Sequence, residues 1–403
     1  MQNNIINGAI CGYMMRAFDK NQFRILSLVS VTIGLRTLGL FMVLPIFTLY
    51  GEKFTGSYLL IGTALGAYGI TMALFQTSLG RLSDRYGRKL IISIGIATFI
   101  IGNLICADPI NIYGLILGRL VEGAGAVSSA GIALVHESVP VNRRNISDAI
   151  IGVAIGLSFM LGVIVGPLLA TIFNYSSIFV IAAIIGAISF IPLWKVKETK
   201  KEKMFKIKAH IDSKLAVISI ISFFIYFYMI VFYLYLPVFS LKYFPVSRFY
   251  EFLIPVVFIA GIIGLAIARP ADKNKTVLFS LVSLIVLLIS VPLFFLNTHV
   301  TDVTYFALSV AGFYSGYIIS ETVFPTLITR LAPKNSYGGN LGFYTSMQHA
   351  GVFFGAVVGG LLIIKVNHDI PIMIIIFTLF VFSIVLLYFI TQFREIYLSN
   401  NVE

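Results

Sequence analysis

The sequence predicts an all-α membrane protein with twelve transmembrane helices in two pseudo-symmetric six-helix bundles. Three observations predict this fold class: long apolar runs, basic residues confined to alternate loops, and an internal repeat. Of the 403 residues, 58% are hydrophobic and only 11% are charged, whereas a soluble domain has about 25% charged residues. Lipid is therefore the expected solvent for most of the chain.

Apolar runs are bounded by Gly, Pro, Asn, Asp and charged residues along the whole chain. Each run is long enough to cross the hydrocarbon core of a bilayer as a helix. The predicted spans are residues 24–49, 57–81, 90–107, 111–135, 148–171, 176–194, 214–240, 250–269, 276–297, 303–328, 339–364 and 370–392.

A lysine-rich segment divides these spans into two sets of six. We interpret residues 195–213 as a basic cytoplasmic linker, a solvated loop that faces anionic lipid rather than a site for a specific partner. The expected domains are an N-terminal cytoplasmic tail, an N-terminal bundle, this linker, a C-terminal bundle and a C-terminal cytoplasmic tail: residues 1–23, 24–194, 195–213, 214–393 and 394–403.

The positive charges alternate between loops. The sequence holds 29 Lys and Arg and has a net charge of +12. On one side of the predicted spans, the loops contain four of these basic residues: Lys53, Lys242, Arg248 and Lys365. By the positive-inside rule the opposite side, with both termini, is cytoplasmic, and a nucleic-acid partner is not needed to explain the charge. We therefore expect a multi-pass protein of the cytoplasmic membrane.

The two halves repeat short elements in the same order and at a nearly constant offset. LPIFTL at the end of the first span recurs as LPVFSL at the end of the seventh, and Gly162–Gly166 in the fifth span matches Gly351–Gly355 in the eleventh. RLSDR after the second span matches RPADK after the eighth. Two bundles with the same orientation, related by an axis along the membrane normal, are typical of such a repeat.

The segment Gly80–Lys89 reads GRLSDRYGRK. It resembles the signature of the loop between helices 2 and 3 in the major facilitator superfamily, G-x-x-x-D-R-x-G-R-[RK]. Gly118–Gly125 resembles the helix 4 motif of that family, with Glu122 in place of the usual Gln. Gly162–Ala170 resembles the helix 5 antiporter motif G-x-x-x-G-P-x-x-G, with Ala170 for the last Gly. Arg36–Pro45 is similar to YajR-type members of the drug/proton antiporter branch.

The resemblance implies that the helix 2–3 motif is a conformational latch. Gly80 allows close helix approach and Gly87 a tight reversal. Asp84 would face the N-terminus of helix 11, which favours an anion. Arg85 and Arg88 need acidic partners, and Glu137 lies where the family places one, so we expect a pair between Arg85 and Glu137. A purely topogenic loop would need the arginines but not the fixed Gly and Asp.

The antiporter-like stripe consists of Gly162, Gly166 and Pro167. Small residues at this spacing permit close helix packing, and proline frees a backbone carbonyl. A role in sealing the transport pathway and plain packing both stay open.

Four ionisable residues lie inside predicted spans, where charge is costly and usually functional. They are Arg36 in helix 1, Arg119 and Glu122 in helix 4, and Glu321 in helix 10, and the resemblance implies that these helices line the central cavity. Arg119 and Glu122 share a helix face and could form a structural pair. Glu321 has no charged neighbour within a turn and is a candidate proton or cation site.

Polar and aromatic residues in the spans could complete a pocket, although most fit packing equally well. The candidates are Tyr68, Gln76, Tyr228, Tyr233, Tyr317 and Gln348.

The leading functional hypothesis is secondary active transport: proton-coupled efflux of small hydrophobic organic compounds by alternating access. A facilitator or symporter of a sugar or organic anion is an alternative that Arg36 and Arg119 favour. An intramembrane hydrolase built on Ser158 and His349 is a remote one, because no other catalytic motif accompanies them. A membrane sensor without transport activity also stays open. We expect a monomer with a small-molecule substrate, protons and the lipid bilayer as partners, and no enzyme activity, cofactor or metal.

Overall fold

The computed structural model is built from helices joined by turns across the residues that it describes. These are residues 18–125, 127–140, 143–196, 212–245, 248–270, 275–296, 302–331, 337–363, 377, 381, 383–384 and 386–391. The first half contains α2 (Lys20–Val43), η1 (Leu44–Ile46), α3 (Phe47–Gly51), α4 (Tyr58–Tyr86), α5 (Arg88–Ala107), α6 (Ile112–Ala124), α7 (Ser128–Ser138), α8 (Arg144–Ile172), α9 (Tyr175–Ile188) and α10 (Phe190–Trp194). The second half contains α11 (Ser213–Ser240), α12 (Phe249–Pro270), α13 (Thr276–Leu296), α14 (Val303–Leu331) and α15 (Tyr337–Ile363).

The all-α membrane class is confirmed. Within the described ranges, nine helical segments are long and apolar enough to cross a membrane. The predicted spans from 24–49 to 339–364 coincide with helices whose ends differ from the prediction by a few residues. The predicted span 370–392 lies largely outside the described residues, of which 386–391 are helical. Most of the predicted linker and both tails also lie outside them.

Polar residues fix where several helices begin. At the start of α2, the Asp19 carboxylate accepts hydrogen bonds from the backbone N–H groups of Asn21 and Gln22, both at 2.8 Å. The caps satisfy N–H groups that have no partner inside a helix. Comparable caps begin α4, α6, α9 and α11: Ser57, Asn111, Asn174 and Asp212.

Three of the predicted continuous spans are interrupted, the sixth by a single turn residue, Ser189, between α9 and α10. The first changes to a 3₁₀ turn at Leu44–Ile46, because Pro45 has no N–H to donate. The fourth ends as α6 at Ala124 and resumes as α7 at Ser128. Here Gly125 lies so close to α5 that a Cβ would be 2.2 Å from the Gly95 carbonyl oxygen. The sequence did not predict this second break, because small residues are equally compatible with an unbroken packed helix.

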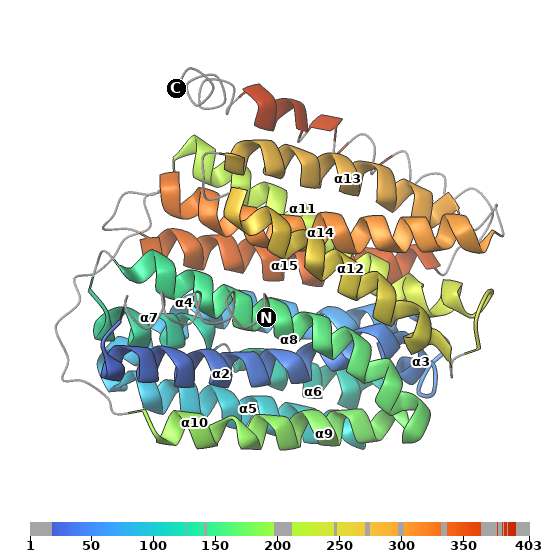
Figure 1. Ribbon diagram of the computed structural model, residues 1–403. Coiled ribbons are helices and arrows are strands. Elements are labelled where there is room, and N and C mark those ends of the chain that lie inside the picture. The colour runs from blue at the N-terminus through green and yellow to red at the C-terminus, as the bar shows by residue number, and fades with distance from the viewer. Residues whose placement is uncertain are drawn as a thin grey trace, which may run out of the picture.

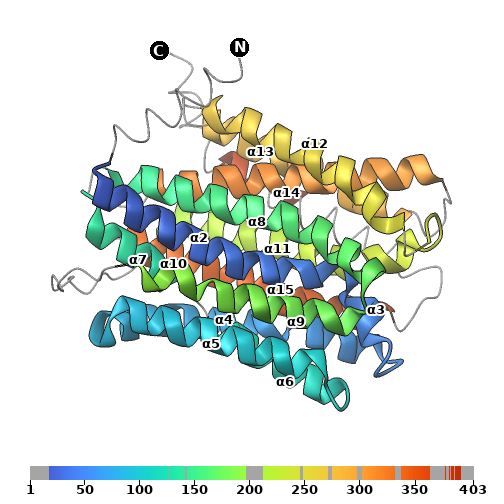
Figure 2. The ribbon, with the colours of Figure 1, turned by 60° about the horizontal axis from the view of Figure 1, so that its bottom comes forward.

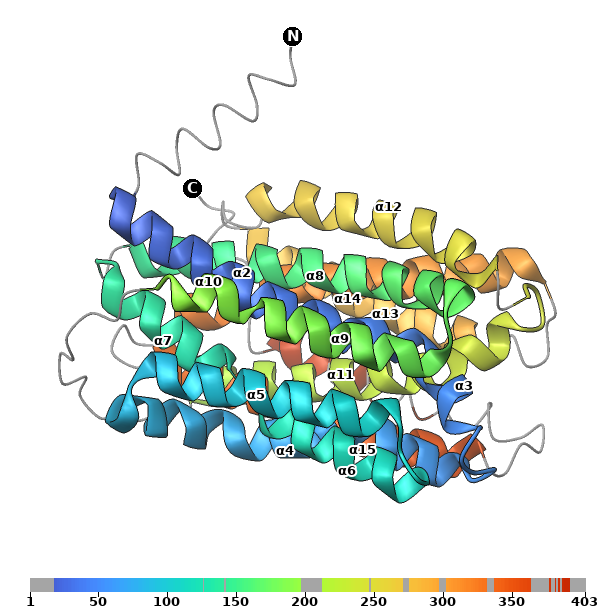
Figure 3. The ribbon, with the colours of Figure 1, turned by 90° about the horizontal axis from the view of Figure 1, so that it is seen from below.

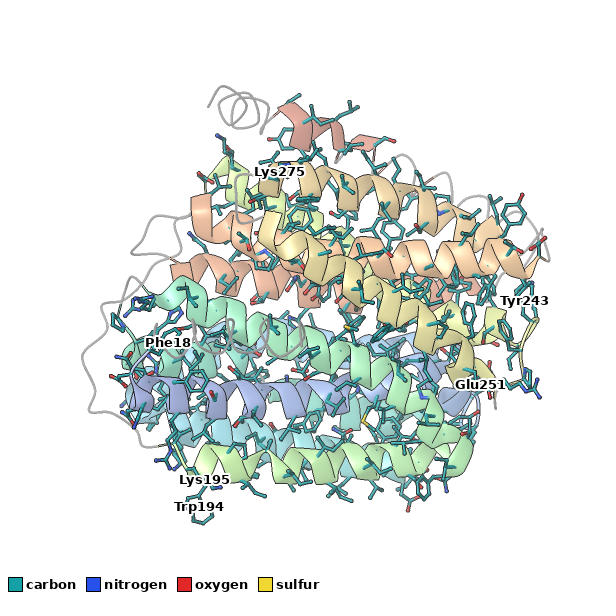
Figure 4. The ribbon with its side chains drawn as sticks, viewed as in Figure 1. Phe18, Trp194, Lys195, Tyr243, Glu251 and Lys275 are labelled. Carbon is teal, nitrogen blue, oxygen red and sulfur yellow. The ribbon has the colours of Figure 1, made fainter. Side chains whose placement is uncertain are left out.

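The connections place alternate loops at opposite ends of the bundle. Figure 4 shows Phe18, Trp194, Lys195 and Lys275 at one end, and Tyr243 and Glu251 at the other. The first end also carries the turn at Gly87, so we call it the motif end; the second carries Pro45, and we call it the proline end. At the motif end, Gly87 has a φ of 108° between α4 and α5, a conformation that glycine adopts without strain.

The internal repeat appears in the packing of equivalent helices. In α8, a Cβ on Gly166 would lie 1.9 Å from the Met42 carbonyl oxygen of α2. In α15, a Cβ on Gly355 would lie 2.4 Å from the Phe227 carbonyl oxygen of α11. The fifth membrane helix (α8) thus packs on the first (α2) through a glycine stripe. The eleventh (α15) packs on the seventh (α11) through the equivalent stripe. This equivalence supports the duplication predicted from the matched sequences.

The two halves lie against each other along two helix pairs, α4 with α15 and α8 with α12. Figure 1 shows the blue-to-green helices of the first half below the yellow-to-orange helices of the second. In Figure 2, α8 lies on the side of α2 that faces the second half, and in Figure 3 α15 runs beside α4. The α4–α15 contact is close, since a Cβ on Gly62 would be 2.2 Å from the Ala356 carbonyl oxygen.

Candidate functional site

Three charged side chains are buried within the predicted spans of the first half. Arg36 on α2 is 2% exposed, while Arg119 and Glu122 on α6 are both 0% exposed. Arg119 and Glu122 form an ion pair between Nη1 and Oε2, the pairing that their spacing allowed. The Arg119 guanidinium also lies 4.4 Å from the ring centroid of Tyr68, so α4 contributes to this cluster. We call these four residues the arginine cluster.

Close helix approach creates the arginine cluster. A Cβ on Gly102 of α5 would lie 2.4 Å from the backbone nitrogen of Glu122. A Cβ on Gly123 would lie 2.2 Å from the Tyr68 carbonyl oxygen. Because glycines allow α4, α5 and α6 to approach each other so closely, the charged side chains are enclosed by protein rather than lipid.

The second half holds a separate polar site around Glu321. The Glu321 carboxylate of α14 accepts a hydrogen bond of 2.9 Å from the Tyr226 hydroxyl of α11. It accepts a longer one, 3.4 Å, from the Gln348 side-chain amide of α15. Both partners are neutral. Three helices of one half thus converge on a single carboxylate, which we call the glutamate site.

The structure shows how Glu321 relates to Arg36 and Arg119, a question that the sequence left open. Among the residues that the structure describes, no ion pair joins Glu321 to Arg36 or Arg119. Within the arginine cluster, Glu122 balances the charge of Arg119. The hydrogen-bond partners of Glu321 are uncharged. A role for Glu321 as counter-ion to either arginine finds no support in this geometry.

An aromatic layer lies between the two sites. Tyr317 packs one turn before Glu321 with its ring centroid 5.7 Å from that of Tyr226. Phe159 of α8 reaches across from the first half and lies 5.1 Å from the Tyr317 ring. Tyr233 of α11 lies near Tyr314 at 6.4 Å. Through Phe159, aromatic packing thus connects the first half to the ring that neighbours Glu321.

Other predicted pocket residues take different positions. Gln348 belongs to the glutamate site, and Tyr68 to the arginine cluster. Gln76 is buried on α4, where its backbone carbonyl accepts a hydrogen bond from Ser129. Tyr228 is buried among the apolar residues of α11.

Sequence reasoning missed Tyr226, the nearest partner of Glu321. Tyr226 and Tyr233 are seven residues apart on α11, so they share one face of that helix. Tyr228 lies on another face. Applying helical spacing to the tyrosines, instead of treating each separately, would have identified Tyr226 as the companion of Tyr233.

The motif end contains a second ionic network. The Arg88 guanidinium donates hydrogen bonds to one carboxylate oxygen of Glu137 from Nε at 2.9 Å and from Nη2 at 2.8 Å. Arg88 also pairs with Asp84 and donates to the Gly80 carbonyl at 3.2 Å. The Arg85 guanidinium lies 5.4 Å from the Tyr86 ring centroid. The structure thus pairs Glu137 with Arg88, whereas we expected its partner to be Arg85.

Among the residues that the structure describes, Asp84 makes no bond to helix 11 (α15), the contact that the resemblance implied. Its side chain is 52% exposed and pairs with Arg88, one turn further along. Within the described residues, this pair takes the place of a bond to the start of α15. The predicted latch contact is therefore not formed within the part of the chain that the structure describes.

The glycine–proline stripe of α8 packs inside the first half. A Cβ on Gly162 would lie 3.0 Å from the Leu38 carbonyl oxygen of α2, and α8 continues through Pro167 as a helix. This geometry accounts for the stripe by helix packing. A sealing role remains a prediction.

The Ser158–His349 dyad does not form. The Ser158 hydroxyl donates to the Ala154 carbonyl of its own helix at 2.8 Å. The His349 Nδ1 lies 2.6 Å from the Thr345 carbonyl oxygen, also within one helix. Neither side chain is directed to the other by a hydrogen bond, so the hydrolase hypothesis has no geometric support.

Comparison with known proteins agrees with this fold. A family model described as Major Facilitator Superfamily matches residues 29–356. An uncharacterized transporter of Buchnera aphidicola subsp. Baizongia pistaciae is 30% identical over 359 residues, covering 83% of this chain and 89% of the relative. The inner membrane transport protein YajR of Escherichia coli is 30% identical over 342 residues, covering 81% and 74%. The solved structure of a D-xylose-proton symporter aligns with a TM-score of 0.71 at 16% identity over 91% of this chain and 97% of the other, a likeness of fold alone.

Proposed function

The chain belongs to the major facilitator superfamily and is a membrane transporter rather than an enzyme; we propose that it exports small hydrophobic organic compounds in exchange for protons. The glutamate site is the observation that supports the proposed proton coupling. There a carboxylate in the middle of α14 has the neutral partners Tyr226 and Gln348. The proposed location is the cytoplasmic membrane, with the motif end in the cytoplasm.

Charge balance explains why Glu321 suits this role. An ionised carboxylate inside a membrane protein is costly, and pairing with a cation or protonation removes this cost. Glu122 is neutralised by Arg119. Glu321 has no such cation among the described residues, so a proton is the simplest neutralising species. Its partners come from α11 and α15, and relative movement of these helices would change how well the ionised form is solvated.

The contacts between the halves support alternating access. At the proline end, the Thr48 hydroxyl of α3 donates a 2.9 Å hydrogen bond to the Leu234 carbonyl of α11. At the motif end, Asp84 is half exposed and, within the described residues, does not bind α15. In the proposed cycle, a conformation joined at the proline end and lacking this bond at the motif end is the inward-facing state.

The decisive experiment compares substrate exchange with proton-driven transport in proteoliposomes. The substrate would be chosen by a thermal-shift screen of organic compounds on the purified protein. Glu321→Gln mimics the protonated carboxyl, so we expect this variant to retain exchange and to lose accumulation driven by a pH gradient. Glu251→Gln, the same substitution at an exposed position of α12, should retain both.

Driven accumulation by Glu321→Gln at the wild-type level would exclude Glu321 as the proton carrier. Joint loss of folding and exchange would instead identify it as a structural counter-ion. A series of measurements at different pH values distinguishes these outcomes from a general loss of activity.

A further inference from the structure

Arg36 is a buried cation without an acceptor. Its side chain is 2% exposed, and Nε has no hydrogen-bond partner. The centroid of the Phe99 ring lies 5.5 Å from its guanidinium carbon. Among the residues that the structure describes, no hydrogen bond or ion pair engages this guanidinium. Buried arginines are normally paired, because an uncompensated charge away from water is strongly unfavourable.

The surrounding cluster does not supply the missing anion. Glu122 is the acid of the cluster, and its Oε2 is engaged by Arg119. Two arginines and one glutamate therefore leave one positive charge in excess. Unused donors remain as well, since Arg119 Nε and Nη2 have no hydrogen-bond partner. The cluster therefore lacks one negative charge to balance its second arginine.

The chemistry of the unused donors indicates which anion would fit. Guanidinium presents planar pairs of N–H groups that match the two oxygens of a carboxylate. A single carboxylate would also balance the excess charge. The rings of Phe47, Tyr68 and Phe99 border the two arginines, so the body of the ligand would meet aromatic rather than polar groups.

We propose that Arg36, with the free N–H groups of Arg119, binds the carboxylate of a small hydrophobic monocarboxylic acid. The inference rests on the proposed function in one respect, because it takes this acid to be the transported compound. It narrows the substrate class from hydrophobic organic compounds in general to those with one acidic group. Arg36 would then be a substrate-binding residue and not a packing element.

The test uses the full chain in lipid nanodiscs with sodium benzoate as the probe. Benzamide is the matched neutral compound, and sodium chloride at equal ionic strength is the matched inorganic anion. Equilibrium binding of radiolabelled benzoate and the unfolding temperature are both measured. We expect benzoate to bind and to raise the unfolding temperature, and benzamide and chloride to have much smaller effects.

The variants separate ligand binding from structure. Loss of a charge-assisted hydrogen bond should weaken benzoate binding to Arg36→Gln by at least about tenfold. Without benzoate, this variant should unfold at or above the wild-type temperature, because it no longer buries an unbalanced charge. The matched control is Arg248→Gln, at an exposed position, which should bind benzoate normally.

Three results would overturn the proposal: equal stabilisation by benzamide, equal stabilisation by chloride, or wild-type benzoate binding by Arg36→Gln. If Arg36→Gln does not fold, the wild-type comparison of benzoate with benzamide still decides. Binding needs no gradient, so it is independent of the Glu321 experiment. Benzoate that binds but does not accumulate with a pH gradient would refute proton coupling and leave the carboxylate site intact.

Discussion

The ion pair between Arg88 and Glu137 allows a quantitative test of the network at the motif end. The perturbation is Glu137→Gln, which preserves shape and removes the charge. Arg88 is 4% exposed and directs two N–H groups to one oxygen of Glu137, at 2.8 and 2.9 Å. The substitution therefore leaves a buried guanidinium with a weaker acceptor.

The expected cost follows from what remains around Arg88. Removing one partner of a buried ion pair typically costs about 3–5 kcal/mol. Asp84 stays paired with Arg88, and the amide that replaces the Glu137 carboxylate can still accept a hydrogen bond. We therefore expect about 2 kcal/mol, in the range for one charge-assisted hydrogen bond. Asp84→Asn removes an acid that is 52% exposed, and should cost about 0.5 kcal/mol or less.

Reversible unfolding in mixed micelles with increasing SDS would measure both changes. A double-mutant cycle with Arg88→Gln should give a coupling of about 1.5–3 kcal/mol for Glu137. Glu251→Gln should change stability by less than about 0.5 kcal/mol. In transport assays, Asp84→Asn and Glu137→Gln should both favour the inward-facing state and impair turnover with little loss of membrane insertion. Equal or greater destabilisation by Asp84→Asn, or a coupling near zero, would refute this reasoning.

Two further predictions concern the contact between the halves. Gly62→Ala places a Cβ against the Ala356 carbonyl oxygen, so it should lower the free energy of unfolding by about 1–3 kcal/mol and slow transport. The control is Gly156→Ala, whose Cβ would meet nothing within 4 Å. It should be neutral in thermal-stability and transport assays. Thr48→Val removes the hydrogen bond to the Leu234 carbonyl and should weaken closure of the proline end by about 1 kcal/mol. Spin labels on the proline-end loops of the two halves would then show a larger population of long distances. An unchanged distance distribution would count against a closing role for this bond.

The fold could be predicted from the sequence because the bilayer imposes strong constraints on it. Span length, loop charge and the repeated glycine stripes are properties of the chain itself. The matched packing of Gly166 on α2 and Gly355 on α11 follows from the duplication. The interruption at Gly125 could not be predicted, because it depends on how closely α5 approaches the backbone between α6 and α7.

The candidate site was only partly predictable, for a related reason. Charged residues in apolar spans are conspicuous, so Arg36, Arg119, Glu122 and Glu321 stood out. Their partners depend on helix rotation and on the closeness of neighbouring helices. The spacing of Arg119 and Glu122 allowed their pair, but no local pattern indicated that Arg36 would be left without an acceptor. Tyr226 was visible only through its helical relation to Tyr233.

The division of charge between the halves connects the two proposals. The arginine cluster of the first half has an excess of one positive charge, and the glutamate site of the second half has one carboxylate without a cation among the described residues. A monocarboxylate would neutralise the former, and a proton the latter. If one anion leaves the cell for each proton that enters, two positive charges effectively move inward in each cycle. An inside-negative membrane potential contributes about 2.3 kcal/mol per charge for every 100 mV, so the potential, in addition to the pH gradient, would favour export.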